Sequence, residues 1–142
     1  MQEYLDFFAN NTLLVVAWIG LVAAIIVMTV MTKFSKVHNI PTQEAVLLIN
    51  KQDAVVVDVR NADEFRKGHI SGAINVPASQ LKANDLSQIQ KYQQKPIILV
   101  CETGMTTTSI GRVLTKADYA QVYALRGGMS DWRTQNLPVT KR

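Results

Sequence analysis

The stretch PIILVCETGMTTTSIGRVLTKA, residues 96–117, has the pattern of a buried strand followed by a short loop and a helix. The continuous apolar run 97–100 is typical of a strand covered on both faces. The spacing of apolar residues in 107–117 predicts a helix. Between them, the loop opens with Cys101, the only cysteine of the chain. We therefore expect Cys101 at the carboxyl end of a buried strand, facing the start of a helix.

This expected position of Cys101 favours a negative charge. The N–H groups at a helix start and the helix dipole both stabilise an anion. Thiolate, not thiol, is the nucleophilic form of cysteine. Cys101 is therefore a candidate catalytic nucleophile. A lone cysteine is also often a small buried hydrophobic residue, and this packing role is the alternative.

Strand and helix patterns alternate through the rest of the C-terminal part. Extended segments are predicted at 54–57, 73–76, 96–100 and 122–125, and helices at 42–50, 63–67, 86–93, 107–117 and 129–135. Thr42 is expected to cap the first of these helices. The alternation predicts an α/β fold with a mainly parallel sheet flanked by helices. Ligands bind such sheets at the carboxyl ends of the strands, where Cys101 is expected.

The N-terminal part has a different composition. No charged residue lies between Asp6 and Lys33, and 12–31 is almost entirely apolar. A helix of this length spans about 30 Å, the thickness of a bilayer core. A secretory signal peptide would begin with basic residues and end at a small-residue cleavage site, and both are missing. We predict a short extracytoplasmic N-terminus at 1–11 and a transmembrane helix at 12–31. A linker at 32–39 then leads to a folded domain at 40–142.

The distribution of charge predicts the orientation of the span. All 15 Lys and Arg residues follow it, with Lys33 and Lys36 directly beside it. The positive-inside rule then places the C-terminal domain in the cytoplasm. A single cysteine, without an intramolecular disulfide, suits a reducing compartment. We expect a single-pass protein of a bacterial inner membrane. Gly20 and Ala24 also have the spacing that lets two helices pack closely.

The net charge of +4 does not indicate a nucleic-acid partner. From Lys33 onward there are 15 basic and 9 acidic residues, because only Glu3 and Asp6 of the 11 acidic residues precede it. The basic residues are scattered, without an Arg-rich run or interleaved aromatics. Attraction to anionic lipid headgroups next to the span is the simpler interpretation. The sequence shows no cluster of metal ligands and no phosphate-binding glycine loop, so no metal or cofactor is expected.

Three motifs resemble those of rhodanese domains. The first consists of DVR at 58–60, EF at 64–65 and GHIxGAINVP at 68–77, and is similar to their N-terminal block. Cys101-x-x-Gly104 falls where their active-site loop lies, and GGMxxW at 127–132 is similar to their C-terminal block. The resemblance covers about 37–138. With the preceding span, the chain resembles a membrane-anchored, single-domain rhodanese-like protein of bacteria.

The resemblance implies sulfur transfer. In this family the cysteine takes the outer sulfur of a donor such as thiosulfate, becomes a persulfide and passes the sulfur to a thiol or another nucleophilic acceptor. The loop is expected to surround the sulfur with N–H groups, with Gly104 at a positive φ. The residues expected to bind the substrate or persulfide are Glu102, Thr103, Gly104, Met105, Thr106 and Thr107. The hydroxyls of Thr106, Thr107 and Thr108 either add donors or cap the helix.

Two loop residues depart from the family pattern. Many active members carry Arg two residues after the loop glycine, where it holds an anionic donor, and this chain has Thr106 there. Glu102 also adds a negative charge beside the sulfur, which disfavours the thiolate and repels thiosulfate. We therefore expect weak turnover of thiosulfate and a different physiological donor. Asp58 and Arg60 are expected to support the site or to form a buried ion pair.

Three other functions are alternatives to sulfur transfer. Related dual-specificity phosphatases use Arg six residues after the cysteine, and Thr107 occupies that place. A Cys-His hydrolase needs a nearby imidazole, but His38 lies near the span and His69 belongs to a block with a structural role. The serious alternative is a non-enzymatic module that binds a protein partner at the membrane.

Other prominent residues are expected to have structural roles. The aromatic residues expected in or near the core are Phe65, Tyr123 and Trp132. The glycine pair Gly127–Gly128 is expected to form a tight turn.

Overall fold

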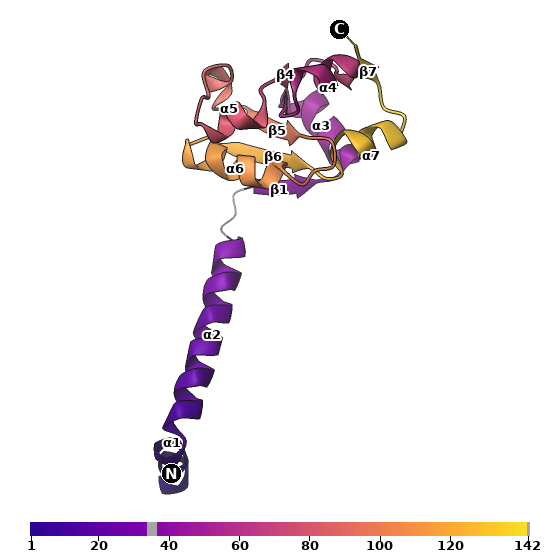
Figure 1. The fold of residues 1–142 in the computed structure, drawn as a ribbon. Coiled ribbons are helices and arrows are strands. Elements are labelled where there is room, and N and C mark those ends of the chain that lie inside the picture. Colours follow the sequence, from indigo (N-terminus) through magenta and orange to yellow (C-terminus); the bar gives the residue numbers. More distant parts are fainter. Residues whose placement is uncertain (34–36, 142) are drawn as a thin grey trace. The chain divides into compact units, whose positions relative to one another are not determined.

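The computed structural model describes residues 1–33 and 37–141, with side chains described for 1–29 and 37–141. They belong to two compact units, Met1–Ser35 and Lys36–Arg142 (Figure 1). The larger unit contains Cys101 and all three motifs noted in the sequence.

The N-terminal unit consists of two helices, α1 (Gln2–Asn10) and α2 (Thr12–Lys33). An 18-residue stretch of α2, Thr12–Thr29, is long and apolar enough to cross a membrane. None of this stretch is buried in the structure. Helix α1 was not predicted. It ends at Asn10, and the side-chain amide of the cap residue, Asn11, donates a hydrogen bond to the carbonyl of Phe7.

The C-terminal unit is built on a five-stranded parallel sheet. The strand order is β1-β6-β5-β2-β4, and each neighbouring pair is parallel. The strands are β1 (Val37–Ile40), β2 (Val55–Asp58), β4 (Ile74–Asn75), β5 (Pro96–Val100) and β6 (Gln121–Leu125). A separate antiparallel pair joins β3 (His69–Ile70) to β7 (Val139–Thr140). The apolar, β-branched composition of β5 suits its central position, where both faces are covered.

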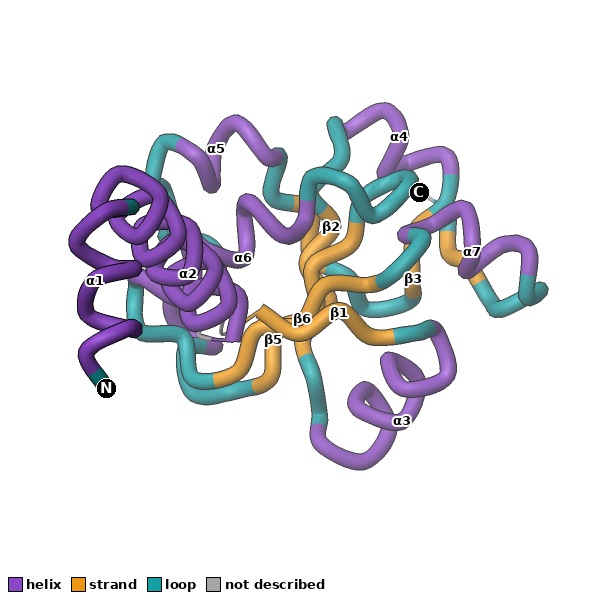
Figure 2. The backbone as a smooth tube through the Cα atoms, turned by 90° about the horizontal axis from the view of Figure 1, so that it is seen from below, coloured by secondary structure: helices purple, strands orange, loops and turns teal. Residues whose placement is uncertain are grey.

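Helices cover both faces of this sheet, as predicted. Helices α5 (Ala78–Lys82) and α6 (Thr107–Lys116) lie on one face, and α3 (Thr42–Gln52) and α7 (Gly128–Thr134) on the other (Figure 2). The remaining elements are α4 (Ala62–Lys67) and the 3-10 helix η1 (Gln90–Tyr92). The predicted α/β fold, with a parallel sheet flanked by helices, is confirmed.

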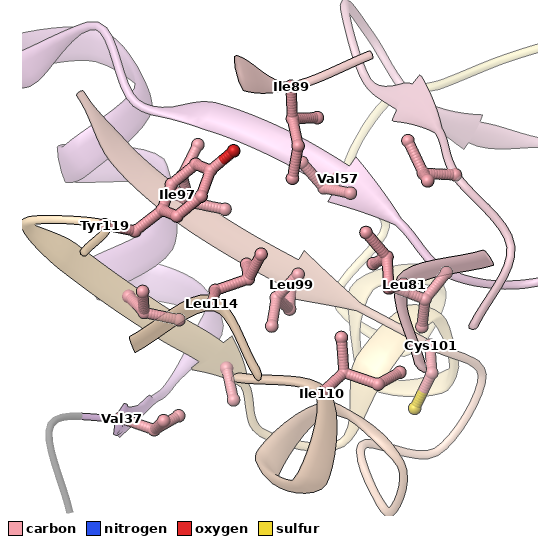
Figure 3. Packing of buried hydrophobic residues seen from close by; sticks show 14 residues of the cluster. Val37, Val57, Leu81, Ile89, Ile97, Leu99, Cys101, Ile110, Leu114 and Tyr119 are labelled. Atoms are coloured by element: carbon pink, nitrogen blue, oxygen red, sulfur yellow. The ribbon is translucent and has the colours of Figure 1, made fainter. Parts of the chain in front are cut away.

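Strand β5 divides the hydrophobic core into two clusters because side chains alternate across a sheet. Ile97 and Leu99 join the cluster under α5 and α6, whereas Ile98 and Val100 join the cluster under α3 and α7. Cys101 continues the alternation and belongs to the first cluster. Figure 3 shows it with its sulfur directed away from Leu99. The register of β5 therefore determines on which side of the sheet the thiol lies.

Three local predictions need correction. The expected linker 32–39 includes the end of α2 and the start of β1, while 34–36 lie outside the described residues. The expected helix 86–93 contains only η1, because successive hydrogen bonds there join residues three apart and Ile89 is its one fully buried apolar anchor. Thr42 does not cap α3. Pro41 is the cap residue, and the Thr42 hydroxyl accepts a hydrogen bond from Gln135.

Candidate active site

Cys101 follows β5 directly, and its side chain lies where the strand meets the loop before α6. The residue is only 5% exposed. The backbone N–H of Gly104 donates a hydrogen bond to Sγ, with 2.8 Å between the two atoms. A backbone dipole directed at the sulfur stabilises negative charge there. The sequence predicted a ring of N–H donors around the sulfur, and the Gly104 contact supplies one such donor.

Gly104 allows the loop to fold back onto the sulfur. Its φ is +86°, the positive value predicted. A Cβ at this position would lie 2.9 Å from the amide nitrogen of Gly127 and 3.1 Å from the carbonyl oxygen of Leu125. Backbone from another part of the chain thus occupies the space that a side chain would need. Both the conformation and the close contact require glycine here.

The other loop residues differ in their surroundings. Thr107 is fully buried, and its hydroxyl donates a hydrogen bond to the carbonyl of Gly104, which closes the loop internally. Thr106 is the cap residue of α6 but makes no side-chain cap hydrogen bond. Thr103 is exposed, and Met105 is 86% exposed. Between Glu102 and Thr107 the loop therefore presents uncharged side chains to solvent.

Asp58 and Arg60, expected as supporting residues, form a buried ion pair at the end of β2. Nη2 of Arg60 lies 2.7 Å from Oδ2 of Asp58, and the two side chains are 3% and 1% exposed. Arg60 also donates to the carbonyl of Gly68. Burial opposes the charge on Arg60, but hydrogen bonds and charge attraction from Asp58, followed by those from Glu102, raise its pKa. Arg60 therefore stays a cation.

Glu102 joins this ion pair to α7. Its Oε2 lies 3.1 Å from Nη1 of Arg60, and its Oε1 lies 2.6 Å from Nη1 of Arg133. The sequence indicated a negative charge beside the sulfur, and the structure pairs that charge with two guanidinium groups. Arg133 was not singled out in the sequence. Its partner lies 31 residues away along the chain, beyond the reach of any local pattern.

The start of α7 holds the backbone of the loop. Met129 N–H donates to the carbonyl of Cys101 at 2.8 Å, and Ser130 N–H donates to the carbonyl of Glu102 at 3.0 Å. Gly127 and Gly128 have φ of +73° and +55°, which fits the predicted tight turn. A Cβ on Gly128 would lie 2.2 Å from the carbonyl oxygen of Cys101. The glycine pair thus permits α7 to approach the loop closely.

The two histidines lie away from these contacts. His69 is buried in β3, stacks on Phe65 at 3.8 Å between ring centroids, and its Nδ1 lies 2.8 Å from the Phe65 carbonyl oxygen. His38 lies in β1, not in a linker, beside the ring of Tyr123. Trp132 is buried, and its indole N–H donates to the Pro138 carbonyl. In the described part of the chain, no group of three or more His, Cys, Asp and Glu residues is placed to hold a metal.

Comparison with known proteins shows the family. Residues 41–135 match the model of the rhodanese-like domain. This chain belongs to the rhodanese family. It is 45% identical to the uncharacterized protein YibN of Escherichia coli (strain K12) over 141 residues, which cover 99% of both chains. It is also 30% identical over 93 residues to thiosulfate sulfurtransferase GlpE of Coxiella burnetii, covering 66% of this chain and 84% of that one.

Solved rhodanese structures agree with the fold. The crystal structure of a rhodanese-related protein from Thermoplasma volcanium superposes with a TM-score of 0.62 and 26% identity, over 74% of this chain and 99% of that one. A thiosulfate sulfurtransferase from Pseudomonas aeruginosa shares the fold with a TM-score of 0.62 and 22% identity, over 73% of this chain and 19% of that one. Family membership supports a function of the sulfurtransferase type.

Proposed function

We propose that this chain is a sulfurtransferase that carries sulfane sulfur on Cys101. The observation that carries the proposal is the hydrogen bond from Gly104 N–H to Sγ, at the carboxyl end of a buried strand in a rhodanese domain. The same donor stabilises charge on a thiolate and on a persulfide. The similarity to a thiosulfate sulfurtransferase supports the same reaction class.

The reaction proceeds in two displacements. The Cys101 thiolate attacks the outer sulfur of the donor, so that a bond forms to Sγ and the donor's S–S bond breaks. The leaving group keeps the electron pair; for thiosulfate it is sulfite. An acceptor thiolate then attacks the outer sulfur of the persulfide, and Sγ leaves as thiolate. Because the loop 102–107 contains no Lys or Arg, we infer weak turnover of thiosulfate and a different physiological donor.

We further propose that the enzyme is anchored in a bacterial inner membrane, with the rhodanese domain in the cytoplasm. The apolar stretch Thr12–Thr29 and its lack of burial support a membrane span. The concentration of all Lys and Arg residues from Lys33 onward supports the orientation. Membrane lipid and a protein partner at the membrane remain proposed partners.

A second candidate is a non-enzymatic module that binds a protein at the membrane. Two observations favour it: Cys101 is only 5% exposed, and Met105 of the same loop is 86% exposed. An exposed apolar side chain on the loop of the cysteine suits contact with a protein surface.

Intact mass spectrometry separates the two candidates. The full-length protein in detergent is incubated with thiosulfate, with glutathione persulfide or with buffer alone. The sulfurtransferase predicts an added mass of about 32 Da, one sulfur atom, that a thiol acceptor removes and that Cys101→Ser abolishes. If no donor adds sulfur to Cys101 while the chain remains folded, the proposal is wrong and the binding module is favoured.

A further inference from the structure

We propose that Arg133 sets the charge selectivity of the Cys101 site, because it neutralises Glu102 and so lets anionic donors approach the sulfur. This inference rests on the proposed sulfur transfer and names a residue outside the loop motif. The loop lacks the arginine that would attract an anion, and Thr106 stands in its place. The positive charge of Arg133, in α7, then determines whether the site repels an anionic donor or lets it approach.

The balance of charges identifies Arg133 as the decisive partner of Glu102. Arg60 is already committed to Asp58, with its Nε and Nη2 atoms on both carboxylate oxygens. Its positive charge is therefore balanced within the buried pair. The second ion pair of Glu102 is with the guanidinium of Arg133, and their atoms Oε1 and Nη1 lie 2.6 Å apart. Loss of Arg133 would leave one net negative charge beside Cys101.

The structure keeps this charge close to the sulfur. Glu102 directly follows Cys101, and the α7 N–H groups of Met129 and Ser130 hold the carbonyls of these two residues. The loop therefore cannot readily turn Glu102 away. At a separation of about 8 Å and an effective dielectric constant between about 40 and 80, one unit charge changes the rate of a monoanionic reagent by about two- to sixfold. Glu102 and Arg133 are each 43% exposed, so salt weakens the effect.

Two alkylating reagents measure this charge without any need for sulfur transfer. Iodoacetamide is neutral and iodoacetate is an anion, and both react with the Cys101 thiolate with formation of a C–S bond and loss of iodide. Cys101 is the only cysteine, so the reaction occurs at one known atom. The ratio of the two rates cancels any change in the thiolate fraction. It reports the electrostatic potential at the sulfur.

The experiment uses the full-length protein in neutral detergent at low salt. The variants are Arg133→Gln, Glu102→Gln and the double variant, with Arg66→Gln as matched control. Arg66 is an exposed arginine paired with Asp63 in its own helix, so the control removes the same charge elsewhere. Other charged groups near the start of α7, such as Asp131 and Arg126, stay unchanged in all variants.

We expect opposite signs from the two single variants. Arg133→Gln lowers the rate ratio of iodoacetate to iodoacetamide about two- to sixfold, Glu102→Gln raises it by a similar factor, and the double variant restores the native ratio. High salt reduces both shifts. Arg133→Gln also raises the KM for thiosulfate more than the KM for an uncharged organic trisulfide donor.

A different pattern would overturn the inference. It fails if the two single variants shift the ratio in the same direction, if Arg66→Gln shifts it as much as Arg133→Gln, or if no variant shifts it. Failure of sulfur transfer is distinguishable, because the alkylation ratio would still respond while no persulfide formed. If neither reagent reaches Cys101 in the folded protein, donors cannot reach it either, and both proposals are wrong.

Discussion

Gly128 lies where α7 meets the Cys101 loop, and Gly128→Ala tests how closely the two must pack. The new Cβ would lie 2.2 Å from the carbonyl oxygen of Cys101 and 2.9 Å from the carbonyl carbon and oxygen of Glu102. All three are backbone atoms, which cannot rotate away. The positive φ of +55° adds a cost of about 1–2 kcal/mol for an L side chain.

The expected destabilisation follows from these contacts. Relief of the clash separates α7 from the loop and weakens the hydrogen bonds from Met129 N–H and Ser130 N–H to the two carbonyls. Each is worth about 0.5–1.5 kcal/mol. Overpacking of this kind costs about 1–3 kcal/mol. With the backbone term, we expect Gly128→Ala to lower the free energy of unfolding by about 3–5 kcal/mol, and a shift of the loop of about 1 Å to slow sulfur transfer by about 100-fold.

Gly72→Ala is the matched control. Gly72 also has a positive φ, +79°, but a Cβ added there would meet no other group within 4 Å. It should therefore lose only about 1–2 kcal/mol, with little change in sulfur transfer. Urea unfolding of the full-length protein, followed by Trp132 fluorescence in a Trp18→Phe background, gives the comparison. The reasoning is refuted if Gly128→Ala is no more damaging than Gly72→Ala in both measurements.

Three further variants test separate parts of the structure. Thr106→Arg restores the missing loop cation and should raise kcat/KM for thiosulfate about tenfold, which steady-state sulfite release measures; an unchanged value would contradict the interpretation of the loop. Arg60→Met leaves the carboxylate of Asp58 buried and unpaired and should cost about 3–5 kcal/mol in urea unfolding, with partial recovery in the double variant Asp58→Asn/Arg60→Met. Burial raises the pKa of Tyr119, so the folded protein keeps the phenol proton longer than the unfolded chain, and stability should fall as pH rises above about 10. Its hydroxyl has no hydrogen-bond partner among the described residues, so Tyr119→Phe should be neutral or stabilising and should lessen that loss when unfolding is measured from pH 8 to 11.

The central part of the fold could be predicted because its signals are local. The apolar run of β5, the glycine of the loop and the spacing of α6 lie within 22 consecutive residues, 96–117. Strand alternation and a positive φ are properties of the residues themselves. The position of Cys101 at the carboxyl end of a central strand followed from these signals.

The missing parts depend on contacts between distant segments. The two-residue strands β3 and β7 pair although His69 and Thr140 lie far apart in the chain, and neither strand carries a periodic pattern of its own. The bridge from Glu102 to Arg133 depends on where α7 docks, so the sequence suggested repulsion where the structure has an ion pair. The segment 86–93 forms only a 3-10 turn, because a single buried Ile89 does not provide the apolar face of a full helix.

The most direct test of sulfur transfer through Cys101 follows one labelled sulfur atom. A donor whose outer sulfur is ³⁴S is mixed with the full-length protein, excess donor is removed, and a thiol acceptor is added. The label is expected on the peptide containing Cys101 and then, in equal amount, on the acceptor. Transfer of label to the acceptor at the same rate with Cys101→Ser, or a labelled Cys101 that never releases its sulfur, would contradict sulfur transfer through Cys101.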